Sequence, residues 1–267
     1  MRTHRLLSFS LLLFSLAACS GESEVITSTS QSAEALYNEA RDLLDNKEYK
    51  SAVSAFEEVE RQHPESPWAV DSQVMSAFSS YRAGDYDTAI GTLDRFVKLY
   101  PNHESTPYAY YLMALCSYEQ ISDVGRDQKM TQEALQALRE VVRRFPDTSY
   151  ARDAKIKLDL TVDHLAGKEM EVGRYYLRQR DYVAAANRFR NVVENYQTTS
   201  HVPEALHRLV ETYLKLGVRE EAQRYASVLG HNFPASVWYR DSYRLLGEKP
   251  EGAAAPAESS WWDSIVP

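Results

Sequence analysis

The chain has 267 residues, of which 44% are hydrophobic and 25% are charged, a composition that supports a substantial core and argues against general disorder. Its formal net charge of −8 makes it an unsuitable general binder of nucleic acid, because neutralising phosphates requires a basic surface. Glycine and proline number only ten each, which favours helix.

The N-terminus, residues 1–18, has the organisation of a secretory signal peptide. Arg2 and Arg5 precede an apolar run, Leu6 to Leu16, that is too short to span a membrane as a helix. The run ends in Leu-Ala-Ala-Cys, which resembles the lipobox of bacterial lipoproteins. We therefore expect cleavage before Cys19, a diacylglycerol on its thiol and an acyl chain on its new amine. The alternative is an ordinary signal peptide in which this cysteine is coincidental.

The residue after the lipobox cysteine and the segment that follows predict a tethered domain. Ser20 stands where an aspartate would retain a lipoprotein in the inner membrane, so by resemblance to the usual sorting rule the address is the outer membrane. Residues 19–32 are rich in Ser, Thr and Glu and predict a flexible tether. Acylation would leave Cys116 as the single free thiol, within an apolar run where we expect it to be buried.

From residue 33 a helical frame recurs: a small residue, apolar residues at +4 and +7, and in four cases proline at +12. Its alanines are separated by 37, 45, 51 and 37 residues and stand at Ala52, Ala89, Ala134, Ala185 and Ala222. Spacing near 34 to 37 residues with this pattern is typical of tetratricopeptide repeats. The sequence thus predicts an all-α tetratricopeptide-repeat superhelix of five helical hairpins, with repeats one to three in residues 33–149 and repeats four and five in 150–246.

Three segments depart from the frame. Glu119 to Thr131 is a longer connection inside the third repeat, either a functional loop or a solvated spacer. Tyr150 to Leu165 predicts an additional amphipathic helix that connects repeats one to three with repeats four and five. Residues 247–267 predict a disordered tail, yet it carries Trp261 and Trp262, which could dock on a partner or fold back on the array.

A search for chemistry finds no nucleophile elbow, phosphate loop, dinucleotide turn, metal-ligand spacing or Cys-x-x-Cys. We therefore expect no enzymatic activity, no metal and no cofactor other than the lipid on Cys19. Charge is more informative, because residues 34–60 carry a net −5 and residues 173–193 a net +4. The basic segment predicts either a docking surface for an acidic partner or a solvated helix face. Its arginines include Arg174, Arg178 and Arg188.

The lipobox, the tether, the five repeats and several segments together resemble the BamD family of outer-membrane lipoproteins, which serves β-barrel assembly. The segments are DRFVKLYPNH, RRFPDTSYARDAKIKL, EVGRYYLRQRDYVAAANRF and HNFPASVWYRDSYRLL. The resemblance implies a non-enzymatic scaffold, anchored by lipid on the periplasmic side of the outer membrane. It also implies binding to the membrane-proximal POTRA domain of BamA, to other Bam subunits and to unfolded outer-membrane proteins.

The same resemblance implies roles for particular residues. An arginine of the family in the second helix of repeat four contacts the POTRA domain, and Arg188, within Ala186 to Phe189, matches it. The family's N-terminal repeats form a groove for unfolded segments, for which the candidates here are Tyr81, Tyr86, Tyr108, Tyr110 and Tyr111. Aromatic rings grip peptide side chains without demanding one sequence, although a tyrosine can equally be filler between helices.

Two other classes of protein share parts of this pattern. A periplasmic repeat adaptor for peptidoglycan synthesis, secretion or pilus assembly would have the lipobox and the array without binding BamA. A lipoprotein hydrolase on a helical scaffold would need a catalytic group, and the sequence nominates none. Co-purification of BamA from solubilised envelopes separates the adaptor from the assembly scaffold.

Overall fold

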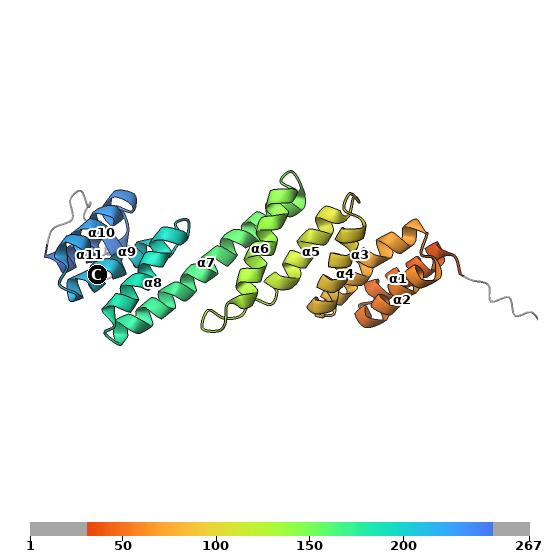
Figure 1. Cartoon of the computed structure of the whole chain (residues 1–267), viewed down its shortest axis with the longest axis horizontal. Coiled ribbons are helices and arrows are strands. Elements are labelled where there is room, and N and C mark those ends of the chain that lie inside the picture. The colour runs from red at the N-terminus through yellow and green to blue at the C-terminus, as the bar shows by residue number, and fades with distance from the viewer. Residues whose placement is uncertain (1–30, 248–267) are drawn as a thin grey trace, which may run out of the picture. The chain divides into compact units, whose positions relative to one another are not determined.

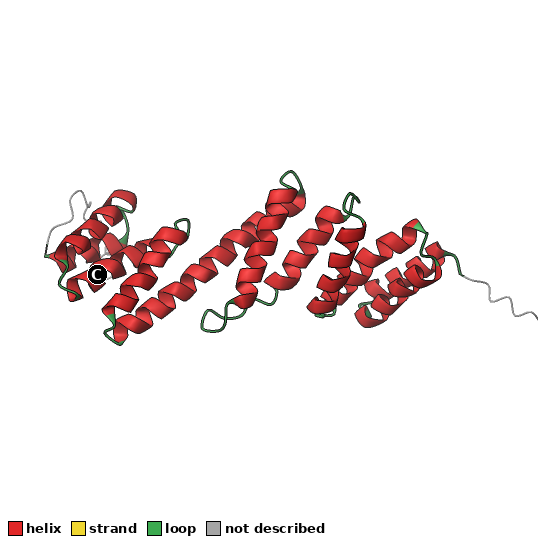
Figure 2. Ribbon diagram, viewed as in Figure 1, coloured by secondary structure: helices red, strands yellow, loops and turns green. Residues whose placement is uncertain are grey.

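The computed structural model describes residues 31–247, and every regular element within them is an α-helix (Figure 2). The helices of these residues are labelled in Figure 1, and their bounds are α1 (Ala33–Asp45), α2 (Tyr49–Gln62), α3 (Pro67–Arg82), α4 (Tyr86–Leu99), α5 (Thr106–Tyr118), α6 (Lys129–Arg144), α7 (Ser149–Arg178), α8 (Tyr182–Asn195), α9 (Val202–Lys215), α10 (Arg219–Asn232) and α11 (Val237–Leu246). None of these helices combines the length and apolar character that crossing a lipid bilayer requires. Cys19, most of the tether and the two tail tryptophans lie outside the described residues.

Each helix packs against the next one along the chain, so α1 to α10 form five helical hairpins, and α11 packs on α9 and α10 (Figure 1). The all-α repeat fold predicted from the sequence is confirmed. The small side chains of the recurring alanines allow the helices to pack closely, and all five alanines are fully buried. The large side chains one turn later fill the space between helices, and Phe56, Leu93, Leu138 and Phe189 are likewise 0% exposed.

Short polar motifs start the helices, and aromatic residues end many of them. The Asp85 carboxylate accepts a hydrogen bond from the Thr88 backbone N–H at 3.3 Å, and Asp181 does the same for Ala184 at 3.1 Å. Such caps satisfy backbone donors that have no partner inside the helix. Gly84 before the α4 cap has φ +79°, a left-handed conformation that glycine adopts without strain. The positions of these turns are therefore determined by residues that are close together in the sequence.

The structure differs from expectation between the third and fourth repeats. The connecting helix predicted at residues 150–165 is not separate; it is the first half of α7, which runs without a break for 30 residues. No proline interrupts this stretch, and Leu165, Ala166 and Met170 continue the buried stripe into the core of repeats four and five. One helix thus packs on α6 with its first half and on α8 with its second (Figure 1).

Close approach of α7 and α8 depends on a glycine in the second half of α7. A Cβ atom at Gly173 would lie 2.5 Å from Cε1 of Phe189, which is fully buried. Only a residue without a side chain leaves room for that ring. The position of α8, and of every side chain it carries, therefore depends on this contact.

Helix α11 was not predicted as a separate element. Its Ser236 cap accepts from the Trp238 backbone N–H at 3.2 Å, and Tyr239 packs so closely over α10 that a Cβ on Gly230 would lie 2.6 Å from its ring. A repeat array leaves an apolar face uncovered at each end, and an additional helix covers it. Helix α11 covers repeat five in this way, because it packs on both α9 and α10.

The long connection in repeat three is folded onto α7. The Gln128 side-chain amide donates to the backbone carbonyls of Asp123 and Arg126 at 3.2 and 3.0 Å, which organises the loop internally. A Cβ on Gly167 of α7 would lie 3.7 Å from the Val124 side chain, so the loop contacts that helix. The loop is a packed part of the array within the described residues.

Candidate partner-binding sites

The first candidate site lies on the outer surface of α8, where Arg188 projects. The helix buries Ala185, Ala186, Phe189 and Val192, so at 3.6 residues per turn Asn187, Arg188 and Asn191 lie toward the surface. These residues line a cavity of about 440 Å³ together with Glu169 and Tyr176 of α7. We call it the Arg188 pocket.

Arg188 is held in this pocket by an ion pair that remains open to solvent. Its Nη1 lies 3.3 Å from Oε2 of Glu169, with the arginine side chain 45% exposed and the glutamate 17% exposed. A partly exposed pair of this kind contributes up to about 1 kcal/mol, so a partner carboxylate can replace Glu169 at small cost. Asn187 and Asn191 lie beside the guanidinium and can donate from their amide N–H groups, while their side-chain oxygens accept from Arg190 at 3.3 Å and from Asn195 at 2.6 Å. The pocket therefore suits a segment that carries an acidic side chain.

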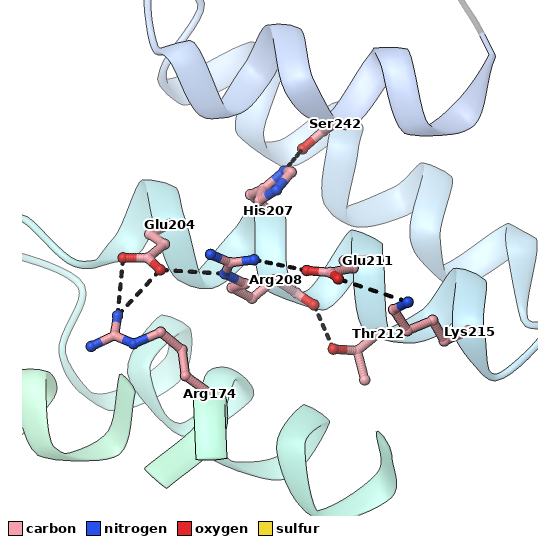
Figure 3. A network of polar contacts seen from close by, with 8 residues as sticks. All are labelled: Arg174, Glu204, His207, Arg208, Glu211, Thr212, Lys215 and Ser242. Atoms are coloured by element: carbon pink, nitrogen blue, oxygen red, sulfur yellow. Dashed lines mark hydrogen bonds and ion pairs between the residues drawn. The ribbon is translucent and has the colours of Figure 1, made fainter. Parts of the chain in front are cut away.

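The other two predicted arginines are arranged differently. Arg174 belongs to a chain of ion pairs between α7 and α9 (Figure 3): its Nη1 lies 3.2 Å from Glu204, which also meets Arg208 at 3.3 Å. Arg208 in turn pairs with Glu211 at 2.8 Å. Arg174 thus joins repeats four and five and does not line the Arg188 pocket. Arg178 is exposed on the last turn of α7. The structure does not bring the three arginines into one site.

The second candidate site is a cluster of tyrosines on α3, α4, α5 and α7. The rings of Tyr81 and Tyr86 lie 5.9 Å apart, and the ring of Tyr150 lies 5.4 Å from Tyr108 and 5.5 Å from Tyr111. Two carboxylates meet the hydroxyl groups, since Tyr81 donates to Glu119 at 3.4 Å and Tyr111 donates to Asp153. This tyrosine cluster combines aromatic faces with anchored hydroxyl groups.

Burial raises the pKa values of tyrosines in this cluster further above neutral pH. It raises the pKa of Tyr108 to about 12, and burial followed by the hydrogen bond to Asp153 also raises the pKa of Tyr111. The hydrogen bond from Tyr111 is the main reason that the pKa of Asp153 is lowered, with Lys157 adding to the effect. At neutral pH the cluster therefore presents uncharged donors next to a firmly ionised carboxylate.

Tyr110, also predicted for this site, lies elsewhere. It is adjacent to Tyr111 in sequence and therefore about 100° away around α5. Its ring lies 5.4 Å from that of Phe145, with the Arg144 guanidinium 4.9 Å above it. Together with Pro101 these residues line a separate cavity of about 230 Å³.

Sequence reasoning missed several residues of both sites. Glu169 of the Arg188 pocket lies on the other helix of the hairpin, and its pairing has a sequence separation of 19 residues. Tyr150 and Asp153 lie in α7, more than a repeat away from Tyr81. Their sequence signal is the amphipathic pattern that predicts a helix from Tyr150 to Leu165. It does not show which ring or hydroxyl group either residue contacts. Among the described residues no cluster of His, Cys, Asp and Glu is arranged to hold a metal ion.

The fold defines the class of protein: this is a tetratricopeptide-repeat protein. The profile of the family described as outer membrane lipoprotein (YfiO) matches residues 29–229, and the chain belongs to this family. It is 49% identical over 240 residues to the outer membrane protein assembly factor BamD of Caulobacter vibrioides, covering 89% of this chain and 79% of that one. It is 47% identical to BamD of Rickettsia prowazekii, covering 79% and 84%. A solved repeat protein of Thermus thermophilus, TTC0263, has 18% identity and a TM-score of 0.37 over 80% of this chain and 98% of that one.

Proposed function

We propose that this chain is a non-enzymatic scaffold in the assembly of β-barrel proteins into the outer membrane, and that the Arg188 pocket docks BamA. The family membership and the names of the curated relatives support the assembly role. The observation that carries the docking site is the solvent-open ion pair of Arg188 with Glu169 inside a polar cavity. The membrane-proximal POTRA domain of BamA is the proposed partner, and one of its carboxylates replaces Glu169 on binding.

Charge reversal at the pocket tests this proposal. Arg188→Glu places two acidic side chains together and removes the cation, so co-purification of BamA with the tagged chain is expected to fall at least about tenfold. Arg152→Glu is the matched control, because Arg152 is exposed, as Arg188 is, but lies on α7 outside the pocket. Equal recovery of BamA with both variants would remove Arg188 from the interface. Absence of BamA from the unmodified chain would favour the periplasmic adaptor instead.

Glu169 competes with the partner for Arg188, so its removal is expected to strengthen partner binding, whereas Arg188→Glu weakens it. Glu169→Gln leaves Arg188 without its ion pair while it keeps a side chain of the same shape. Binding of the partner is expected to strengthen by up to about fivefold, which corresponds to the free energy of about 1 kcal/mol that one partly exposed ion pair contributes. A weaker complex would show that Glu169 positions Arg188 for the partner rather than competing with it.

The tyrosine cluster is the proposed contact for unfolded outer-membrane proteins. Its rings offer aromatic surface from four helices, which suits segments of varied sequence. Tyr86→Ser is expected to reduce cross-linking to an unfolded β-barrel protein by about threefold, on the scale of one aromatic pair. Tyr175→Ser, which removes a ring that is 52% exposed at the end of α7, is the control. Equal losses in both variants would count against the cluster.

The anchor is part of the same proposal. Acylation of Cys19 holds the array on the periplasmic side of the outer membrane, and the signal peptide and lipobox support it. Cys19→Ala is expected to move the chain from the membrane fraction to the soluble periplasm once the Arg188→Glu change has also removed partner retention. Persistence of the double variant in washed outer membranes would argue against lipid anchoring as the attachment.

A further inference from the structure

A further cleft lies between the loop at residues 119–128 and α7, next to the tyrosine cluster, with which it shares Glu119. It has a volume of about 400 Å³ and is lined by Glu119 and Asp123 from the loop side and by Leu160 and His164 from α7. We call it the loop cleft. At about 100° per residue, Glu169 of the Arg188 pocket lies on the opposite side of α7 from Leu160. The two cavities therefore open on different faces of the same helix.

The α7 wall of the loop cleft exposes aliphatic surface. Leu160 is 56% exposed, and Ile156, one turn earlier on the same face, is 63% exposed. Single exposed aliphatic residues are ordinary, but here Leu160 lines the cleft and Ile156 extends the exposed aliphatic face one turn further along α7. Covering them would remove apolar area from water, which is the main driving force for association.

The loop wall supplies negative charge that the chain itself does not neutralise. Within residues 31–247 neither Glu119 nor Asp123 forms an ion pair. Glu119 accepts only a long hydrogen bond of 3.4 Å from Tyr81, and Asp123 accepts from the Gly125 backbone N–H at 2.8 Å. Lys157, which lies 5.5 Å above the ring of Tyr118 at the edge of the cleft, is engaged with Asp153 at 3.1 Å. The two carboxylates are thus available to a cation from outside.

A buried polar atom in the cleft also lacks a partner. Nε2 of His164 is buried and makes no hydrogen bond within the described part of the chain. Buried polar groups are almost always satisfied, so this nitrogen, in a residue that lines the cleft, has a hydrogen bond that a ligand can complete. The ring nitrogen can pair with either a backbone N–H or a backbone carbonyl, depending on its tautomer.

We propose that the loop cleft binds an extended polypeptide segment of a partner protein in which a Lys or Arg stands next to a large aliphatic residue. The cation lies between Glu119 and Asp123, the aliphatic side chain packs on Ile156 and Leu160, and a backbone group of the segment pairs with His164. Alternation of the two side chains along an extended chain places them on opposite walls. The acidic wall disfavours an anionic lipid surface. This docking surface shares Glu119 with the tyrosine cluster, but it does not require that the cluster binds unfolded outer-membrane proteins.

Binding of a designed peptide to the complete chain tests the proposal. The probe is a short fluorescein-labelled peptide that alternates Leu and Lys, followed by fluorescence anisotropy against a blank without protein. Removal of both charges by Glu119→Gln with Asp123→Asn is expected to weaken binding about tenfold, the upper range for two partly exposed ion pairs. These variants keep the acceptors for Tyr81 and Gly125, so the loop can retain its fold. Leu160→Gln is expected to weaken binding about fivefold through lost apolar burial.

Matched controls make the result specific. Glu65→Gln with Asp147→Asn removes the same charge from exposed turns elsewhere and is expected to leave affinity unchanged. Arg188→Glu is also expected to leave it unchanged, which separates this surface from the proposed BamA site. Hydrogen exchange is expected to slow in residues 119–128 when the peptide is added.

Four results would overturn the proposal. They are equal binding by the parent and the Glu119–Asp123 double variant, equal binding of a peptide with Glu in place of Lys, and protection by the peptide at another site only. The fourth is a concentration-dependent dimer in sedimentation that the double variant abolishes, which would make a second copy of the chain the occupant of the cleft.

Discussion

Gly173→Ala probes the contact that sets the position of α8. Alanine is the better helix former, by about 0.8–1 kcal/mol, so propensity alone predicts a more stable array. At this position, however, the new Cβ would lie 2.5, 2.8 and 2.9 Å from three ring atoms of Phe189, which is 0% exposed and has no free space to move into. Overpacking of this kind costs about 1–3 kcal/mol, and the steric term exceeds the propensity gain. Subtracting the propensity gain leaves an expected net loss of up to about 2 kcal/mol.

Gly91→Ala is the matched control, because it makes the same change inside α4 with no heavy atom within 4 Å of the new Cβ. This variant is expected to gain about 0.5–1 kcal/mol. Urea unfolding followed by circular dichroism measures both changes in parallel, and thermal midpoints are expected to move in opposite directions by about 2–4 °C per kcal/mol. Phe189→Leu should partly restore the Gly173→Ala chain, since the two changes share one space. Equal stabilisation by both alanines would refute the steric argument.

Three further predictions concern titratable groups. His207 is buried, and burial is the main reason that its pKa is lowered. Its Nδ1 donates a hydrogen bond to the Ser242 hydroxyl, because that hydroxyl itself donates to the Trp238 carbonyl. The stability it contributes is therefore complete above pH about 6.5 and is lost as pH falls below that value. Amide protection factors in α11, corrected for the intrinsic exchange rate, are expected to be lower at pH 5.5 than at neutral pH, and equal protection would contradict the prediction. Burial raises the pKa of Cys116 to about 12, so its thiol is expected to react with a disulfide reagent at pH 8 only after denaturation; rapid native labelling would count against this. Tyr111→Phe removes the main hydrogen-bond donor to Asp153, so the pKa of the Asp153 carboxyl is expected to rise. Carboxyl NMR titration measures this shift, and Tyr86→Phe is the control that should leave the Asp153 pKa unchanged.

Much of the fold could be predicted from the sequence because a tetratricopeptide hairpin is specified locally. The frame of alanine, apolar residues and proline identified all five hairpins, and each of its alanines is buried. Gly84 provides the left-handed turn and Asp85 the cap of α4, and both features depend only on neighbouring residues. The continuity of α7 was missed because a single stripe of apolar residues serves two neighbours in succession. Periodicity shows that a face is buried but does not show which helix covers it.

The sites depended on contacts between helices that are distant in sequence. The charge pattern alone identified the basic segment containing Arg188, because like charges that are close together along the chain are visible in a sequence. The accessibility of its arginines depends on ion pairs with other helices. Glu169 pairs with Arg188, and Glu204 pairs with Arg174. In the same way Tyr111 and Tyr110 are neighbours in sequence, and only packing against Tyr150 and Phe145 separated them.

The sequence by itself determined the repeat class, the helix boundaries set by caps and turns, the lipobox and the position of the basic segment. These features depend on residues within about one hairpin of one another, for which spacing and local chemistry suffice. Tertiary structure alone decided the single long α7, the covering of repeat five by α11, the separation of the three arginines and the loop cleft. Each of these arises where side chains from different hairpins compete for the same space or the same charge, and that competition is resolved only when the hairpins pack together.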